Sequence, residues 1–326
     1  MQHGILVPPF VDDPTGFAVR AEELGYESAW VAELWHESSV VRLADVAART
    51  DRIELGTAIL NVYSRTPAVL AMTAATLDRV SDGRFTLGVG TSTQKAVEDL
   101  HGQTWEDPNP IRHAHECIEL TKEFLTGEGR VEYDGETFHA ADFPALGVDV
   151  PVYHAALGEA NRRVVARLCD GWIPHNVPFR DLSDAFDYIA DHAEEAGRDP
   201  DDITVAPYLP ACVSDDEAEA KRMVRKHLAY YVGNGKGYER AVAERFPEGG
   251  ERVASHWRSG DREAAADAVT DEMVRALGVA GTPETAREQL REVVALDAVD
   301  RPMVTVPNSA GHLAERTLEE LAPDRL

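Results

Sequence analysis

The sequence predicts an α/β protein with the (β/α)8 TIM-barrel architecture. Eight short runs rich in β-branched and aromatic residues alternate with amphipathic helical stretches along the 326 residues. This alternation is typical of parallel βα units, and a closed barrel accounts for eight strands more naturally than an open sheet does. The chain is longer than the roughly 250 residues of a typical barrel. We therefore expect a single domain over residues 1–326 that carries insertions.

The expected elements follow one another at regular intervals. Strands are predicted at 4–7, 28–32, 52–59, 84–89, 151–155, 170–173, 203–213 and 302–307. Helices are predicted at 14–24, 39–49, 67–80, 110–126, 159–168, 180–197, 215–231 and 284–295. Thr66-Pro67 and Thr282-Pro283 mark two of the helix starts, because proline is favoured at the first helical position.

Two stretches interrupt this alternation. Residues 90–110 form a polar, proline-containing connection after the fourth strand, and residues 229–281 insert extra helices between the seventh and eighth strands. Loops at the carboxyl ends of barrel strands build active sites, so the first stretch is a candidate wall or lid. The second carries aromatic side chains for packing, and we interpret it as a dimer contact or a cover for the core.

Charge and cysteine usage exclude several classes of function. Lys and Arg total 32 against 58 Asp and Glu, a formal net charge of −26. This balance argues against nucleic-acid and anionic membrane surfaces as partners, since both require basic patches. We interpret the acidic, lysine-poor composition as an adaptation to a salt-rich cytoplasm of a halophilic archaeon. The three cysteines form no CxxC pair and no zinc-type cluster, so we expect reduced thiols and no metal site.

No stretch predicts export or a membrane span. The N-terminal apolar run has no basic region before it, and no later run approaches the roughly 18 apolar residues of a membrane-spanning helix. We therefore expect a soluble, cytoplasmic protein.

Polar side chains follow the second and third expected strands. The second strand runs into Glu33 and His36, a carboxylate and an imidazole that together suit general acid or base chemistry. The third strand runs into Asn61, Tyr63 and Arg65, which offer hydrogen-bond donors and an aromatic face. In both places, ordinary polar loop residues without a catalytic role remain an alternative.

Two glycine-containing turns bear on cofactor binding. Residues 88–93 (GVGTST) lack the third glycine and the first-strand context of a dinucleotide fingerprint, which argues against a Rossmann-type site. Residues 155–163 (AALGEANRR) follow the fifth strand and open a helix. The N–H groups of such a helix start bind phosphate, with Gly158 permitting close approach and Arg162 adding positive charge. Alone, this turn is a weak signal.

Longer stretches of the chain resemble a known family, the bacterial-luciferase-like flavin and deazaflavin oxidoreductases. The stretches are GYESAWVAELW (25–35), RIELGTAILNVYSRTPAVLAMTAATLDRVSDGRFTLGVGTS (52–92), VPVYHAALGEANRRVVARLCDGWIP (150–174) and VAGTPETAREQL (279–290). The chain looks most similar to the branch that uses coenzyme F420, which includes methylenetetrahydromethanopterin reductase.

The resemblance implies a TIM barrel with a cofactor ring across its mouth. It also implies a bulge in the third strand behind the ring, with a non-prolyl cis peptide between Ala58 and Ile59. By the same resemblance, Asn61, Thr91 and Ser92 contact the ring, and the turn before residue 159 holds the phosphate of the cofactor's side chain. With Arg162 from the helix start, the expected cofactor residues are Ala58, Ile59, Asn61, Thr91, Ser92, Ala156, Leu157, Gly158 and Arg162.

We therefore expect a coenzyme F420-dependent oxidoreductase that moves a hydride between deazaflavin C5 and a small organic or pterin-like substrate. Glu33 lies where relatives place an acidic residue near the ring and is the first candidate for proton handling, followed by His36. Trp35, Tyr63 and His175 are candidate substrate contacts. Several relatives carry an Asp-His pair where this chain has Glu33-Leu34, and an acidic residue at Thr93, so the proton donor stays open.

Two alternatives also stay open. One is an FMN-dependent monooxygenase of the same family, and the other is a non-catalytic flavin- or deazaflavin-binding protein. A homodimer is implied by the resemblance alone.

Overall fold

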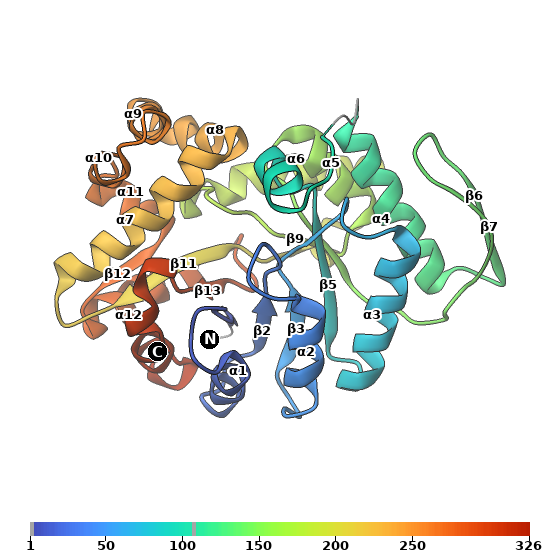
Figure 1. Cartoon of the computed structure of the whole chain (residues 1–326), viewed down its shortest axis with the longest axis horizontal. Helices are drawn as coiled ribbons and strands as arrows, with labels where there is room; N and C mark the ends of the chain where they lie inside the picture. Colours follow the sequence, from blue (N-terminus) through green and yellow to red (C-terminus); the bar gives the residue numbers. More distant parts are fainter. Residues whose placement is uncertain (1–2, 106–108) are drawn as a thin grey trace. The chain divides into compact units, whose positions relative to one another are not determined.

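The computed structural model describes residues 3–105 and 109–326. Residue contacts divide the chain into two compact units, which we call the central unit and the terminal unit. The central unit comprises Trp30–Ile173 and Tyr188–Thr204, and the terminal unit comprises Met1–Ala29, Pro174–Asp187 and Val205–Leu326. Figure 1 labels most of the helices and strands. β2, α6 and β10 each contain a boundary between the units.

In the central unit, strands and helices alternate. The sheet order is β10-β9-β8-β5-β3-β2, with β4 also paired to β5. The strands are β2 (Ser28–Val31), β3 (Glu54–Thr57), β4 (Leu60–Asn61), β5 (Phe85–Gly90), β8 (Val152–Ala155), β9 (Gly171–Trp172) and β10 (Thr204–Val205). The helices are α2 (Ser39–Ala47), α3 (Pro67–Ser81), α4 (Pro110–Thr126), α5 (Glu159–Leu168) and α6 (Leu182–Glu195), with a π-helical turn η1 (Ala96–Leu100) and a 3-10 turn η3 (Pro200–Asp202).

The terminal unit has the strand order β1-β13-β11-β12, with every neighbouring pair parallel. The strands are β1 (Gly4–Leu6), β11 (Tyr208–Val213), β12 (Val279–Gly281) and β13 (Met303–Thr305). The helices are α1 (Pro14–Glu23), α7 (Glu217–Asn234), α8 (Lys236–Arg245), α9 (Pro247–Arg258), α10 (Arg262–Asp267), α11 (Asp271–Leu277), α12 (Pro283–Val294) and α13 (Ala314–Glu320), with the 3-10 turns η2 (Phe179–Asp181), η4 (Asn308–Leu313) and η5 (Pro323–Arg325).

Each of the eight predicted strands has a counterpart, with differences of a few residues at the ends, but two predictions were wrong about continuity. The strand predicted at 203–213 is two strands, β10 and β11, and the strand predicted at 52–59 ends at Thr57 before β4 begins. The structure adds a β-hairpin of β6 (Arg130–Asp134) and β7 (His139–Pro144), which extends beside α4 (Figure 1). The predicted insertion at 229–281 is helical up to Leu277 and then ends in a strand, β12, which pairs with β11. An all-helical interpretation of that stretch was therefore wrong at its end, where three buried small or β-branched residues extend the sheet.

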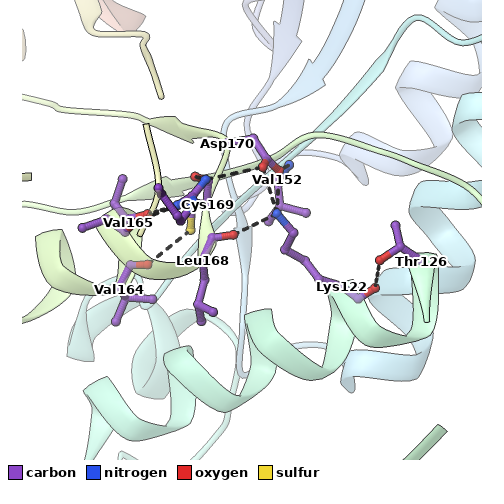
Figure 2. A network of polar contacts seen from close by, with 10 residues as sticks. Lys122, Thr126, Val152, Val164, Val165, Leu168, Cys169 and Asp170 are labelled. Carbon is purple, nitrogen blue, oxygen red and sulfur yellow. Dashed lines mark hydrogen bonds and ion pairs between the residues drawn. The ribbon is translucent and has the colours of Figure 1, made fainter. Parts of the chain in front are cut away.

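A polar network fixes one end of the central unit around Asp170 (Figure 2). Lys122 of α4 donates to both carboxylate oxygens of Asp170, at 2.8 and 2.9 Å, and to the carbonyl of Leu168 at 2.9 Å. The same carboxylate accepts the N–H of Val152 at 2.8 Å, where β8 begins. These bonds connect α4 to β8 and to the end of α5, so they set the spacing between the two helices.

Burial of the cysteines agrees with the expectation of unpaired thiols. Cys117, Cys169 and Cys212 are buried and form no disulfide. Burial raises the pKa of each thiol to about 12, so all three are protonated at neutral pH. Among the described residues, no helix is both long and apolar enough to cross a membrane.

Candidate functional site

The third strand is interrupted at the position that the resemblance implied. β3 ends at Thr57, β4 begins at Leu60, and the peptide bond between Ala58 and Ile59 is cis. Ala58 still donates its N–H to the carbonyl of Val31 in β2, at 2.9 Å. The predicted continuous strand over 52–59 is therefore two strands separated by a bulge.

The pairing with β5 shows how the bulge is accommodated. From Gly56 to Leu60 the chain advances by four residues, while β5 advances by only three, from Thr86 to Val89. One extra residue thus lies opposite β5, which is the definition of a β-bulge. Bulges often lie next to active sites, because they redirect the strand that follows.

Thr57 and Gly88 hold this bulge against β5. The Thr57 hydroxyl donates to the Gly88 carbonyl at 2.8 Å and accepts the Gly88 N–H at 2.9 Å. The side chain therefore satisfies two backbone groups that a regular partner strand would have satisfied. A Cβ atom at position 88 would lie 1.9 Å from the Thr57 carbonyl oxygen, so only glycine permits this close approach.

Asn61 ends β4 and has an unsatisfied donor. Its side chain is buried, and Oδ1 accepts the N–H of Tyr63 at 2.8 Å. Its Nδ2 has no hydrogen-bond partner among the described residues. A buried amide donor without a partner costs about 1–3 kcal/mol, so such a group favours a ligand that presents an acceptor.

Glu33 and Arg65 form an ion pair beside the bulge. Arg65 donates to the two carboxylate oxygens of Glu33, at 2.5 and 3.0 Å, and the N–H and hydroxyl of Ser39 also donate to that carboxylate, at 2.9 and 3.2 Å. Burial alone would raise the pKa of Glu33, but the Arg65 charge and these hydrogen bonds outweigh it and lower the pKa. Glu33 is therefore an anion at neutral pH.

The two aromatic residues predicted after Glu33 are exposed. The rings of Trp35 and His36 lie 6.1 Å apart, and both side chains face solvent. No hydrogen bond or ion pair joins the described side chains of His36 and Glu33. The structure thus separates the two candidate proton carriers that the sequence places three residues apart.

An aromatic cluster surrounds Tyr63. The Tyr63 ring stacks on His113 of α4 with centroids 4.3 Å apart, and it lies 5.4 Å from Trp105. His113 also contacts the edge of Phe138, at 4.9 Å. The sequence pattern did not identify His113 as a site residue, since its neighbour in space is 50 positions away in the chain.

The connection after β5 returns to the loop that carries Glu33. It forms the π-helical turn η1, and Nε2 of His101 lies 2.8 Å from the carbonyl oxygen of Leu34. Thr91 and Ser92 follow β5 directly and are half-buried. Residues 106–108 of the predicted insertion at 90–110 lie outside the described residues.

The N-terminus of α5 is open. Gly158 is the N-cap residue and offers no capping side chain, and a Cβ atom placed on it would meet nothing within 4 Å. The first N–H groups of the helix therefore lack a side-chain partner. Ala156 is buried just before this turn, where its carbonyl accepts the indole N–H of Trp172 at 2.7 Å, and Arg162 lies over the Trp172 ring at 5.6 Å. Leu157, which lies between Ala156 and Gly158 in the chain, is half-buried.

His154 links β5 to α5 from inside the core. Its Nδ1 lies 3.2 Å from the Val89 carbonyl and its Nε2 lies 3.4 Å from Oδ1 of Asn161. Burial lowers the pKa of His154, so the ring is neutral and donates its single N–H to one of these two oxygens. Sequence reasoning missed this residue, although a histidine within an apolar strand was the available signal.

In the terminal unit, His175 lies in a buried aromatic cluster. Its ring stacks on Tyr208 at 4.4 Å and contacts Tyr231 edge-on at 4.2 Å, and His227 lies 5.8 Å away. Burial and the neighbouring His227 hold the pKa of His175 well below its ordinary value. In the part of the chain that the structure describes, its Nε2 has no hydrogen-bond partner. His175 is thus a neutral ring with an unsatisfied nitrogen.

Known proteins resemble the chain over most of its length. Residues 8–300 match the family model described as luciferase-like monooxygenase. A 5,10-methylenetetrahydromethanopterin reductase of Methanolobus tindarius is 30% identical, over 85% of this chain and 85% of the relative. An F420-dependent glucose-6-phosphate dehydrogenase of Nakamurella multipartita is 31% identical, over 64% of this chain and 66% of the relative.

The likeness extends to three dimensions. The solved structure of the coenzyme F420-dependent tetrahydromethanopterin reductase of Methanopyrus kandleri matches with a TM-score of 0.82 and 26% identity, over 99% of this chain and 97% of that chain. This match confirms the predicted fold class, an α/β TIM barrel with insertions. Because the family model covers far more than half of its residues, the chain belongs to the luciferase-like monooxygenase family.

Proposed function

We propose that this protein is a coenzyme F420-dependent oxidoreductase that transfers a hydride to or from a small organic or pterin-like substrate. The observation that carries the proposal is the buried Nδ2 of Asn61, an unsatisfied donor directly after the bulge at Ala58 and Ile59. A ring with carbonyl acceptors along one edge suits such a donor. The sequence relatives named for F420-dependent activity favour the deazaflavin over other ring cofactors.

The central unit offers groups for each part of this cofactor. Asn61 would donate to the ring, and Ala58 and Ile59 would support its back. The uncapped N–H groups after Gly158 would bind the phosphate, because helix N-termini favour anions, and Arg162 adds positive charge nearby. The connections after β5 and β8 carry the remaining candidate cofactor contacts, which are Thr91, Ser92, Ala156 and Leu157. When bound, the deazaflavin supplies the hydride chemistry at C5.

We assign proton handling to Glu33. Its lowered pKa keeps the carboxylate ionised, which suits a proton acceptor more than a proton donor. Arg65 and Ser39 fix its orientation, so the carboxylate needs little reorganisation. Replacing Glu33 with glutamine is expected to lower kcat about 100-fold or more while the cofactor still binds. An unchanged kcat in the variant would remove Glu33 from the mechanism and leave His36 as the next candidate.

We also propose Trp35, Tyr63 and His175 as substrate contacts. Tyr63 offers a stacking face next to the bulge, and His175 offers an unsatisfied ring nitrogen. Replacing Tyr63 with leucine should raise KM for the substrate more than it lowers kcat, because the ring contributes binding and not proton transfer. A kcat effect without a KM effect would contradict this role.

A flavin-dependent monooxygenase is the second candidate, because the matching family model is described as luciferase-like monooxygenase. The two functions differ in the atom at position 5 of the ring. A reduced flavin reacts rapidly with oxygen, whereas a reduced deazaflavin does not. The test is oxygen uptake by the protein with reduced FMN and with reduced F420. Rapid uptake with FMN, together with no binding of F420, would establish the monooxygenase.

We further propose a homodimer that works in a salt-rich cytoplasm. The net charge of −26 supports the second part, since dense carboxylates keep a protein hydrated where salt screens repulsion. Light scattering should give twice the chain mass, and thermal stability should rise with KCl concentration. A monomeric mass would refute the homodimer. A thermal stability that does not change with salt would refute the adaptation to a salt-rich cytoplasm.

A further inference from the structure

A groove between α4 and α5 of the central unit is lined by basic side chains. It has a volume of about 290 Å³ and lies between one face of each helix. It is lined by Asn109, Ile111, Arg112, His115, Ala160, Arg163, Val164 and Arg167. The volume is at the low end for small-molecule pockets, so the groove suits one segment of a larger ligand.

The arginines on α5 are not neutralised by the fold. Arg163 and Arg167 lie four residues apart and share one helix face. Neither forms an ion pair with a carboxylate among the described residues; Arg163 donates instead to the Tyr188 hydroxyl at 2.7 Å. Like charges at this spacing destabilise a helix by a few tenths of a kcal/mol. In a chain of net charge −26, two such cations side by side favour an external anion.

The α4 side of the groove is partly neutralised. Arg112 lies 3.4 Å from Glu136 and 4.0 Å from Glu116, and His115 lies 4.0 Å from Glu119. The unpaired positive charge is therefore concentrated on α5. Arginine binds carboxylates through paired N–H donors, so the groove is suited to a ligand that carries several carboxylates.

The groove begins beside the uncapped N-terminus of α5. Ala160, in its lining, is two residues from Gly158, and Arg167 lies nine residues from Gly158. At the helical rise of about 1.5 Å per residue, this is roughly 13 Å along the helix axis. A ligand with a phosphate at the helix start and carboxylates on the chain beyond it would match this order of groups. Coenzyme F420 has that order, because γ-linked glutamates follow its phosphate.

We propose that the α4–α5 groove binds the oligoglutamate tail of coenzyme F420, with Arg163 and Arg167 pairing its carboxylates. This inference rests on the proposed function, since it concerns the same cofactor. It assigns a role to a basic surface that the hydride transfer itself does not require.

The test compares two forms of the cofactor by equilibrium fluorescence titration, without substrate. One form carries a single glutamate and the other carries several. Arg163→Gln and Arg167→Gln should each weaken binding of the long-tailed form about three- to fivefold, and the double variant about tenfold, as expected for partly exposed charge pairs. Binding of the short-tailed form should change less than about twofold. Because no substrate is present, a difference in affinity between the two forms reflects binding of the cofactor itself.

Arg79→Gln is the matched control. It removes the same charge from an exposed position at the end of α3, in the same unit but outside the groove. It should leave both affinities within about twofold of the wild type. The advantage of the long tail should also shrink between about 0.15 and 1 M salt, because the screening length falls from about 8 to 3 Å.

Two results with the variants would overturn the inference, and two results with the wild type would do so as well. One is a double variant that binds the long-tailed form as tightly as the wild type does. The other is an equal loss for both forms, which would place the arginines at the phosphate. If the wild-type protein binds neither form, the proposed function fails together with the inference. If both forms bind equally well to the wild type, only the inference fails.

Discussion

Replacing Arg65 with glutamine would remove the partner that holds Glu33 ionised. The two side chains are only 18% and 13% exposed, and two N–H groups of Arg65 contact the carboxylate. Breaking a fully buried pair costs about 3–5 kcal/mol, and breaking an exposed pair costs about 0–1 kcal/mol. The Ser39 hydrogen bonds remain in the variant. We therefore expect a loss of about 2–3 kcal/mol in the free energy of unfolding at pH 7.

The pH dependence gives this prediction a second, independent readout. The folded pKa of Glu33 lies below its unfolded value, which is about 4.3. Its stabilising contribution is thus present above the unfolded pKa and is lost as pH falls through the folded pKa. Without Arg65, burial favours the protonated form of Glu33 and raises its pKa, so the variant lacks the stability that the wild type loses on acidification. The difference between wild type and variant should be largest near pH 7 and should shrink toward pH 3.

Denaturant unfolding at constant salt, at pH 7 and at low pH, measures both effects. Arg49→Gln is the control, because Arg49, just after α2, pairs with Asp45 of α2, and the two side chains are 59% and 38% exposed. Its loss should be about 0.3–0.5 kcal/mol. A double-mutant cycle with Glu33→Gln should give a coupling of about 2 kcal/mol. If Arg65→Gln costs no more than Arg49→Gln and shows no pH dependence, the ion pair does not hold Glu33.

Four further substitutions test the framework of the central unit by the free energy of unfolding. Thr57→Val should cost about 1–3 kcal/mol, because it leaves the Gly88 N–H without its partner; a neutral effect would mean that water replaces the hydroxyl. Gly88→Ala should cost about 2 kcal/mol or more, because its Cβ would lie 1.9 Å from a carbonyl oxygen. Gly158→Ala, whose Cβ meets nothing within 4 Å, should cost less than about 1 kcal/mol, and equal losses at the two glycines would contradict the steric argument. Lys122→Met should cost about 1–2 kcal/mol by removing the nearer of two cations beside Asp170, since Arg198 lies 3.9 Å from the same carboxylate, and an unchanged midpoint would show that Arg198 and solvent fully compensate for the network in Figure 2.

The elements of the barrel could be predicted because their signals are local. The predicted helix at 67–80 is α3 (Pro67–Ser81), and the Thr66 side chain accepts the Val69 N–H as an N-cap. The predicted start at Thr282 is likewise an N-cap that accepts the Thr285 N–H. Such starts depend on a few adjacent residues, so the sequence alone indicates them.

The missed elements have weak local signals. β6 alternates charged residues with Val131 and Tyr133, but it has only five residues, and its partner β7 is mostly exposed and has no regular alternation, so the pair gives a weak signal of a hairpin. β12 has three residues, too few to establish any period. Pairing with β11, and not the residues of β12 themselves, makes it a strand.

The features of the site also divide into those that the sequence could identify and those that it could not. The cis bond at Ala58–Ile59 followed from the family resemblance, and no feature of the two residue types indicates it. Glu33 and Arg65 were both candidates, yet their pairing across 32 positions depends on the tertiary arrangement of two loops. Sequence reasoning therefore identified the residues of the site more readily than the partners that set their charge.

The most direct test of the proposed function is a parallel titration of the protein with F420 and with FMN in high salt, followed by cofactor fluorescence. We expect saturable binding of F420 at one site per chain and weaker binding of FMN. We also expect that Asn61→Leu, which removes the unsatisfied donor, weakens F420 binding about tenfold or more. Tight binding of FMN without binding of F420 would contradict the account, and so would an Asn61→Leu variant that binds F420 as tightly as the wild type.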